Sequence, residues 1–273
     1  MATKKERQRE LARQAYERRM DRLSRRARRT RQLWVSAIAA VLVAAVGVGV
    51  PALLGVFKSA AAKKPVASSS PAAHPSAGPT SALVNGKCVY TTAGTAARKV
   101  SLPPATPDTN ATYTATMTTN RGKIVISLLN NKAPCTVNSF VSLAGQKYFD
   151  NTPCHRLTTA QSGIYVLQCG DPTGQGSGGP GYVFYTENLK GAKYPAGTVA
   201  MANSGSANSN GSQFFLVYKD TPLPANYTPF GTITSGLSVL QAVANAGTDN
   251  SNGAGDGHPK DSVQIESMTI SKT

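Results

Sequence analysis

Residues 33–57 constrain the chain most, because these 25 consecutive positions carry no charged side chain. A helix of that length rises about 37 Å, whereas the hydrocarbon core of a bilayer is about 30 Å thick. Trp34 lies at one end of the run, where an indole suits the headgroup region. The run is too long for a core helix, and both it and the preceding arm are too long for a cleaved signal peptide. We therefore expect one uncleaved transmembrane helix.

The charges on the two sides of this run predict its orientation. Residues 1–32 hold 13 of the 29 Lys and Arg side chains and only 4 of the 13 acidic ones. Because basic flanks stay inside, we expect a cytoplasmic N-terminus and an extracytoplasmic domain in the cell membrane. Apolar residues recur every three to four positions over 8–30, which predicts an amphipathic helix on anionic lipid headgroups. Lipid contact is sufficient to explain this arm, so no nucleic-acid partner is expected.

Composition after residue 57 separates a tether from a folded domain. Residues 58–82 contain 8 Ala, 6 Ser and 4 Pro and lack aromatic residues. Such a segment cannot form a core, so we expect a disordered tether. Residues 83–110 mix apolar and proline-rich stretches, and we interpret them as an N-terminal extension pinned by Cys88. The predicted organisation is a basic arm (1–32), a signal anchor (33–57), a tether with extension (58–110) and a folded domain (111–273).

All four cysteines follow the apolar run, which places them in the compartment where disulfides persist. No CxxC pair occurs, so a zinc site is not expected. Four cysteines allow three connectivities, and their spacing alone does not choose among them. Our working hypothesis is Cys135–Cys154, which would fix a helix to the sheet, and Cys88–Cys169, which would hold the extension over the domain.

The folded domain shows many short strands and only two helices. Alternating residues at 112–118 and 123–129 flank a turn and predict a hairpin. Pro134 opens an apolar helix that ends at Gly145, and a second helix fits residues 236–246. Further strands are expected at 153–158, 163–168, 197–202, 212–218, 229–234 and 263–270. This pattern predicts a mainly β antiparallel barrel with helices over its ends.

Four sequence blocks of this domain resemble the signature of the cyclophilins. They are CHRL at 154–157, YVLQCGDPTGQGSGGPG at 165–181, GTVAMAN at 197–203 and GSQFFL at 211–216. Their order and spacing match the family over residues 112–271. The resemblance implies a closed eight-stranded barrel capped by two helices and peptidyl-prolyl cis-trans isomerase activity without a cofactor. Arm, span and tether together resemble the membrane-anchored cyclophilins of actinobacteria.

The chemistry of proline isomerisation suits these blocks. Rotation about an Xaa–Pro bond faces a barrier of roughly 18–20 kcal/mol, and no covalent bond breaks, so neither a nucleophile nor a metal is required. A site needs only to favour the twisted amide, whose proline nitrogen accepts a hydrogen bond. An arginine supplies permanently charged donors for this purpose. By resemblance, Arg156 is the catalytic arginine, and Gln168 holds it together with the substrate carbonyl.

The resemblance also implies the substrate-binding residues. Phe215 would form the floor of the proline pocket, with Val166 and Leu223 as its walls. The other substrate-binding residues implied are Tyr165, Ala202, Asn203, Gln213 and Tyr227. A single strand arginine is usually solvated and a Phe-Phe pair is usually core, so only the joint pattern favours a functional interpretation. His155 faces away from its neighbour Arg156 by strand alternation, and we interpret it as structural.

Some positions depart from the family pattern. Tyr165 stands where Phe is usual, and Tyr227 and Pro222 stand where many members carry His and Trp. Tyr227 can still wall the pocket and donate a hydrogen bond. Without the indole at position 222, weak cyclosporin binding at most is expected. The glycine-rich stretch 170–181 lacks a GK[ST] motif, which argues against a nucleotide site.

Two classes of function are compatible with the sequence. The first is an isomerase that binds proline-containing polypeptides and assists the folding of extracytoplasmic proteins. The second is a non-catalytic proline-peptide binding or scaffolding module at the cell surface. The combination of Arg156, Gln168 and Phe215 favours the isomerase, because binding alone would not demand the arginine.

Overall fold

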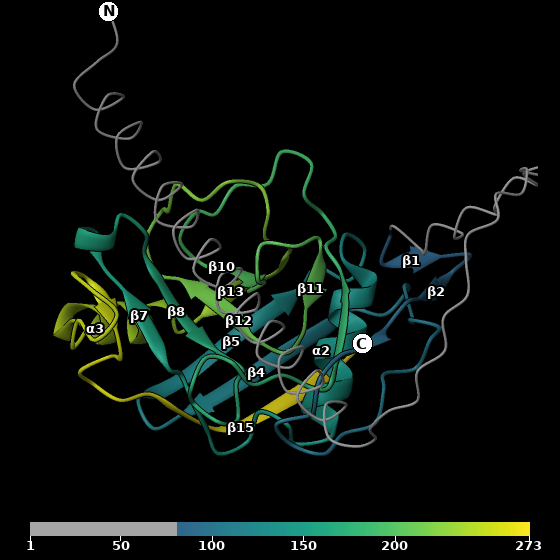
Figure 1. The fold of residues 1–273 in the computed structure, drawn as a ribbon, viewed down its shortest axis with the longest axis horizontal. Coiled ribbons are helices and arrows are strands. Elements are labelled where there is room, and N and C mark those ends of the chain that lie inside the picture. Colours follow the sequence, from purple (N-terminus) through teal and green to yellow (C-terminus); the bar gives the residue numbers. More distant parts are fainter. Residues whose placement is uncertain (1–80) are drawn as a thin grey trace, which may run out of the picture. The chain divides into compact units, whose positions relative to one another are not determined.

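The computed structural model describes residues 81–273, which form a mainly β domain with two helices (Figure 1). The predicted basic arm, the membrane span at 33–57 and most of the predicted tether lie outside the described residues. Within 81–273, neither helix has the length and hydropathy that crossing a bilayer requires.

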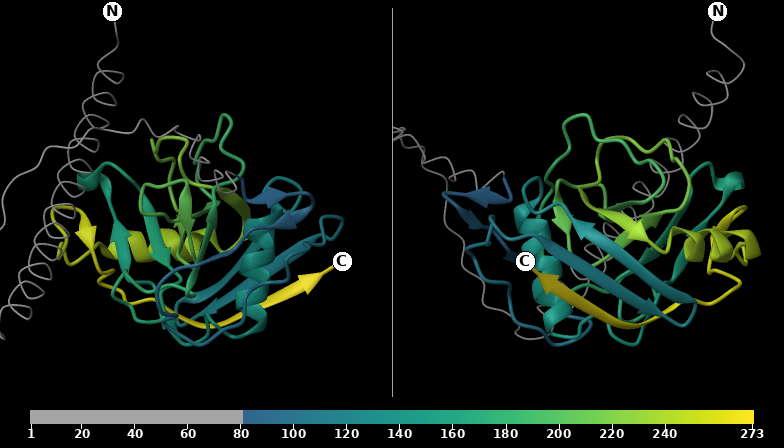
Figure 2. Two further views of the ribbon diagram at one scale, coloured as in Figure 1. Left: turned by 45° about the vertical axis from the view of Figure 1, so that its right-hand side comes forward. Right: turned by 180° about the vertical axis from the view of Figure 1, so that it is seen from behind.

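Ten strands form one curled antiparallel sheet, seen from three sides in Figures 1 and 2. In hydrogen-bonded order they are β14 (Asp256–Gly257), β7 (Arg156–Thr158), β8 (Val166–Cys169), β12 (Phe214–Val217), β10 (Thr198–Met201), β13 (Pro229–Ser235), β5 (Gly122–Leu128), β4 (Tyr113–Thr119), β15 (Gln264–Lys272) and β6 (Thr152–Pro153). The predicted hairpin is the pair β4–β5. The strands expected at 197–202, 229–234 and 263–270 are found within one or two residues of their predicted ends, as β10, β13 and β15. Those expected at 163–168 and 212–218 are shorter, as β8 and β12, and the one expected at 153–158 is split into β6 and β7.

The expected closed eight-stranded barrel needs a correction. The strand order is open among the described residues, with β14 and β6 at its two ends. β6 pairs with β15 and β7 with β8, and only Cys154 and His155 separate β6 from β7. Pro153 cannot donate a ladder hydrogen bond, and the chain changes partner strands just after it. The strand expected at 153–158 is therefore split between β6, at one end of the curled sheet, and β7, next to β14 at the other end.

The two predicted helices are confirmed, as α2 (Pro134–Gly145) and α3 (Leu237–Ala246), with a short 3-10 turn, η1 (Ala160–Ser162), elsewhere. They lie at opposite ends of the sheet in Figures 1 and 2. Pro134 suits the first turn because an N–H there has no helical partner. The Glu187 carboxylate accepts the backbone N–H groups of Cys135 and Thr136 at 3.2 and 2.7 Å, which caps the start of α2.

An aromatic cluster fills the core between α2 and the sheet. Phe140 of α2 packs against Phe149, Phe214 and Phe230, with ring centroids 5.0–5.4 Å apart. All four rings are buried. Burying such a side chain contributes about 1.5–3 kcal/mol. The packing of Phe140 therefore stabilises β12 and β13 on the face of the sheet that α2 covers.

The extension before residue 111 folds onto the domain through strands that the sequence analysis missed. β1 (Leu83–Val84) and β2 (Lys87–Cys88) form a hairpin. β3 (Thr91–Thr92) pairs with β9 (Tyr182–Tyr185), which also pairs with β11 (Asn208–Asn210). These strands are two to four residues long, too short for alternation to reveal them.

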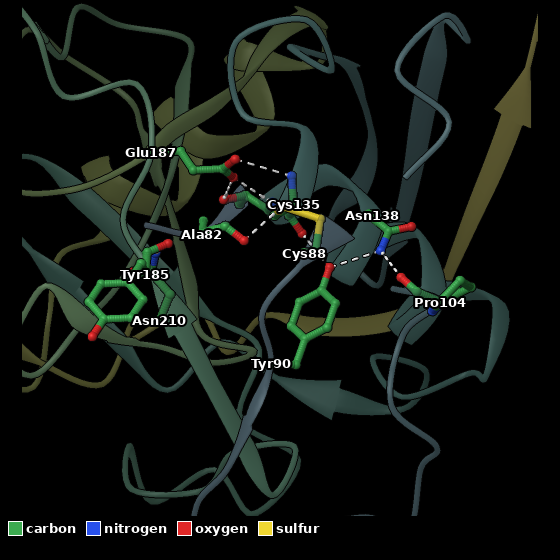
Figure 3. Close-up of a disulfide and its surroundings, with 10 residues drawn as sticks. Ala82, Cys88, Tyr90, Pro104, Cys135, Asn138, Tyr185, Glu187 and Asn210 are labelled. Carbon is green, nitrogen blue, oxygen red and sulfur yellow. Dashed lines mark hydrogen bonds between the residues drawn. A yellow bond between two sulfur atoms is a disulfide. The ribbon is translucent and has the colours of Figure 1, made fainter. Parts of the chain in front are cut away.

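Disulfides join Cys88 to Cys135 and Cys154 to Cys169, so both expected pairings were wrong. The register of β7 and β8 explains the second bridge, because the adjacent pair Arg156 and Gln168 brings both cysteines close, with their Cα atoms 4.0 Å apart. The first bridge joins β2 to the start of α2 (Figure 3). It pins the extension to a helix, not to the β8 strand.

Candidate active site

Four residues form one row across four neighbouring strands. Arg156 on β7 is opposite Gln168 on β8, which is opposite Phe215 on β12, which is opposite Ala200 on β10. Side chains alternate between the two faces of a strand, so the adjacent row points into the core. That buried row consists of Leu157, Leu167, Leu216 and Val199. The core row thus fixes the strands on which the outer row is displayed.

Arg156 is held in a defined orientation by two side chains. Its Nε and Nη2 donate to the two oxygens of Asp256, each at 2.8 Å, and its Nη1 donates to Gln168 Oε1 at 3.1 Å. The Arg156 side chain is 30% exposed, whereas that of Asp256 is only 4% exposed. A two-pronged contact with a buried carboxylate fixes the guanidinium plane and leaves the arginine within reach of a ligand.

A chain of amides connects Arg156 to the glycine loop (residues 176–181). Gln168 Nε2 donates to Gln213 Oε1 at 2.8 Å. Gln213 Nε2 in turn donates to the carbonyls of Gly176 and Gly178 at 3.0 and 2.9 Å. The loop is tied down because Gly178 N donates to the buried Asp171 carboxylate at 3.0 Å. The hydrogen bonds from Arg156 through to the loop therefore fix the orientations of both Gln168 and Gln213.

An apolar cluster surrounds Phe215 and is separate from the main core. Its buried members are Val166, Tyr194, Ala200, Phe215 and Val217, with Ala192, Ala202, Leu223 and Tyr227 partly buried around them. The rings of Phe215 and Tyr227 pack edge to face, with their centroids 5.5 Å apart. Tyr194 Oη donates to the Tyr227 carbonyl at 2.8 Å and accepts from Tyr227 N at 3.1 Å. The cluster offers a small apolar site next to a charged donor.

Most of the sequence-predicted site residues come together here. Those in the row, the amide chain or the apolar cluster are Arg156, Gln168, Val166, Ala202, Gln213, Phe215, Leu223 and Tyr227. Asn203 lies beside them, where its Nδ2 donates to the Asn226 carbonyl at 2.8 Å.

Tyr165 does not join this group. Strand alternation places it on the side of Leu167 and away from Val166. It packs against the main core, with its ring 5.9 Å from that of Tyr218 and Lys219 Nζ 4.8 Å from its centroid. The expectation that Tyr165 contacts substrate stays a prediction.

Sequence reasoning missed two residues of the site, Asp256 and Tyr194. Asp256 lies in a stretch rich in Gly and Asn, 100 residues after the arginine that it holds. Its one available signal was chemical, because a fixed arginine beside an apolar pocket calls for a carboxylate partner. Tyr194 lies in a loop and belongs to none of the blocks that carry the resemblance.

His155 is buried, and neither ring nitrogen has a hydrogen-bond partner among the described residues. Burial lowers its pKa, so the neutral ring is favoured. This agrees with the interpretation of His155 as structural. Within residues 81–273, no group of three or more His, Cys, Asp or Glu side chains is placed to hold a metal ion.

The family described as cyclophilin type peptidyl-prolyl cis-trans isomerase/CLD matches residues 114–270. The chain belongs to the cyclophilin family. The match includes the apolar cluster and the whole row formed by Arg156, Gln168, Phe215 and Ala200, and it starts after the extension at 81–110. This cyclophilin is thus a family domain preceded by an additional folded segment.

Curated relatives and solved structures agree with this membership. The probable peptidyl-prolyl cis-trans isomerase B of Mycobacterium leprae is 48% identical over 199 residues, 67% of this chain and 66% of that protein. Its Mycobacterium tuberculosis counterpart is 46% identical over 206 residues, 70% of this chain and 66% of the relative. This cyclophilin therefore spans just under two thirds of the length of either relative.

Two crystal structures of a Cryptosporidium parvum cyclophilin type isomerase share the fold. One has a TM-score of 0.53 at 30% identity, and the other, in the presence of the dipeptide Ala-Pro, has 0.52 at 31%. Each comparison covers 59% of this chain and 99% of the other.

Proposed function

We propose that this cyclophilin is a peptidyl-prolyl cis-trans isomerase that acts on Xaa–Pro bonds of extracytoplasmic proteins and assists their folding. The observation that carries the proposal is Arg156, held by Asp256 and Gln168 in one row with the apolar cluster around Phe215. The names of the curated relatives and the Ala-Pro dipeptide present with the Cryptosporidium neighbour support the same activity.

The arrangement favours the twisted amide over the planar one. The apolar cluster takes the pyrrolidine ring, and Gln168 lies where it can donate to the adjacent carbonyl. When the amide twists, its nitrogen loses conjugation and accepts a hydrogen bond from Arg156. Because the guanidinium is already oriented, little reorganisation accompanies this step. Five decades of acceleration would require about 7 kcal/mol of differential stabilisation.

The test is a protease-coupled assay of the full chain, kept in a mild detergent, on a peptide with one Xaa–Pro bond. The proposal predicts that cis-to-trans conversion is much faster than the uncatalysed reaction, which takes tens to hundreds of seconds. Binding of the peptide without acceleration would instead favour the non-catalytic binding module.

The proposal includes a single-pass anchor at residues 33–57, with the N-terminus in the cytoplasm and the isomerase domain outside. The charge asymmetry around the run and the two disulfides of the domain support it. Protease added to intact spheroplasts should digest the domain or release it. A domain protected until the cells are lysed would contradict this orientation.

A further inference from the structure

A cleft begins at the row formed by Arg156, Gln168, Phe215 and Ala200. It has a volume of about 510 Å³, and its lining includes Gln168, Ala202, Asn203 and Gln213. Gln168 is the residue to which Arg156 donates, so the cleft starts one hydrogen bond from the guanidinium. A polypeptide whose proline occupies the apolar cluster can therefore place a neighbouring residue in this cleft.

One wall of the cleft comes from outside the region that matches the family. Ala93, Gly94 and Thr95 line it, facing the glycine loop (residues 176–181). The extension is held in this position by the pairing of β3 with β9 and by two backbone hydrogen bonds to the loop. In these, Ala93 N donates to Gly181 O at 2.9 Å and Ala97 N to Gly179 O at 2.8 Å.

Anchors on both sides of residues 93–95 hold this wall. Before it, the Cys88–Cys135 disulfide is reinforced by Tyr90, whose hydroxyl donates to the Cys135 carbonyl at 2.9 Å and accepts from Asn138 Nδ2 at 2.8 Å (Figure 3). After it, Arg98 Nη1 donates to three carbonyls at 2.7–3.0 Å, those of Lys147, Tyr148 and Asp150. The wall is therefore a fixed part of the cleft.

The glycine loop permits this close approach. Gly181 has a φ of +82°, and a Cβ on it would lie 3.1 Å from the Ala96 side chain. The same loop supplies the carbonyls that hold Gln213. The extension therefore lines the cleft and also contacts the glycine loop that orients Gln213.

The chemistry of the cleft indicates what it accepts. Among residues 81–273, the side chains that line it include hydroxyls and amides beside small apolar groups, and none of them carries a formal charge. A charged group would lose hydration there without gaining an ionic partner, whereas an uncharged polar group can exchange its water hydrogen bonds for those of the cleft.

We propose that residues 93–95 of the extension form a specificity wall, which selects substrates with an uncharged side chain next to the Xaa–Pro unit. This inference rests on the proposed isomerase function and adds its substrate class. Thr95 supplies the exposed side chain of the wall best suited to a test. A charge introduced there shifts the ratio of activity on Glu and Lys peptides in a direction set by its sign.

The experiment measures kcat/KM of the full chain, in a mild detergent, on matched peptides carrying Gln, Lys or Glu either before the Xaa–Pro unit or after it. The natural chain should favour Gln in one of the two series. Thr95→Lys should raise the ratio of Glu to Lys peptides in that series by roughly threefold or more, and Thr95→Asp should lower it by a similar factor.

Thr91→Lys is the matched control, because Thr91 is also exposed on the extension but does not line the cleft. If the Thr95 variants show the same ratios as this control in both series, the specificity wall is wrong. Absence of isomerase activity on every peptide would instead overturn the proposed function. In that case the Kd values of the same peptides give the same ratio, and equal values for the Thr95 variants and the control would also overturn the wall.

Discussion

Asp256 grips Arg156 through two hydrogen bonds of 2.8 Å, although 100 residues separate them in the chain. The carboxylate is almost fully buried, and the guanidinium remains partly exposed. The buried Asp256 carboxylate therefore holds the Arg156 guanidinium, which must donate to a substrate, in one orientation. A guanidinium free to rotate would have to be oriented in each catalytic cycle.

Replacing Asp256 should therefore impair catalysis. We expect Asp256→Asn to reduce isomerase kcat/KM about tenfold or more, mainly through kcat, because a neutral amide cannot accept both guanidinium bonds. Asp261→Asn is a suitable control, since Asp261 pairs with Arg121 at 3.8 Å and both side chains are well exposed. Equal kcat/KM in the two variants would mean that Asp256 does not position Arg156.

The disulfide connectivity can be checked by mass spectrometry of the non-reduced, alkylated protein. We expect linked peptides containing Cys88 with Cys135 and Cys154 with Cys169. Replacing both Cys88 and Cys135 by Ser should lower the free energy of unfolding by about 4 kcal/mol, as the chain-entropy relation gives for a loop of this length. Four free thiols, or any other pairing, would contradict the structure.

The sequence predicted most of the sheet because its periodic segments are long. Residues 112–118 and 123–129 alternate clearly and became β4 and β5, and both helices begin within a residue of the expected start. The short strands of the extension offer no period to detect. The extension is held by backbone hydrogen bonds such as that from Ala93 N to Gly181 O, and such bonds place little demand on residue type.

The candidate site was predicted in part for a similar reason. Arg156, Gln168 and Phe215 lie in sequence blocks whose alternation puts them on one face, whereas Asp256 reaches the site only through the pairing of β14 with β7. Tyr165, which the resemblance assigns to the site, packs against Tyr218 outside the apolar cluster. The cysteine pairing depended on strand register, which spacing does not give.

His155 should make the domain sensitive to acid. Burial is the main cause of its lowered pKa; Asp171 opposes the shift, and Arg156 and His258 add to it. Below the ordinary pKa of 6.5, the unfolded chain then binds more protons at this residue than the folded one, so stability falls as pH decreases.

The measurement is urea unfolding of residues 81–273, followed by circular dichroism, at about pH 7.5 and about pH 5.5. We expect the natural sequence to lose more free energy of unfolding on acidification than His155→Phe does. His258→Asn, at an exposed position, should retain most of the loss, because burial and not His258 is the main cause of the lowered His155 pKa. Equal losses in the natural sequence and His155→Phe would exclude His155 as the source.

Cyclosporin should inhibit this cyclophilin weakly. Pro222, which is exposed beside the partly buried Leu223, stands where many family members carry Trp, so a hydrogen-bond donor and aromatic surface are missing. The loss amounts to about 1 kcal/mol for the bond and about 1–3 kcal/mol for the ring, or one to three decades in affinity. Pro222→Trp should therefore strengthen inhibition at fixed substrate. Nanomolar inhibition of the natural protein, or no gain in the variant, would show the alignment at position 222 to be wrong.

The role of Arg156 is tested most directly by the kcat/KM of Arg156→Ala on an Xaa–Pro peptide, beside Arg121→Ala as a control. Arg121 is also an arginine paired with an aspartate, but its partner is Asp261, which lies outside the row that contains Arg156. The account predicts a loss of about 100-fold or more for Arg156→Ala with the fold retained, and near-natural activity for the control. Near-natural kcat/KM in Arg156→Ala would contradict the mechanism.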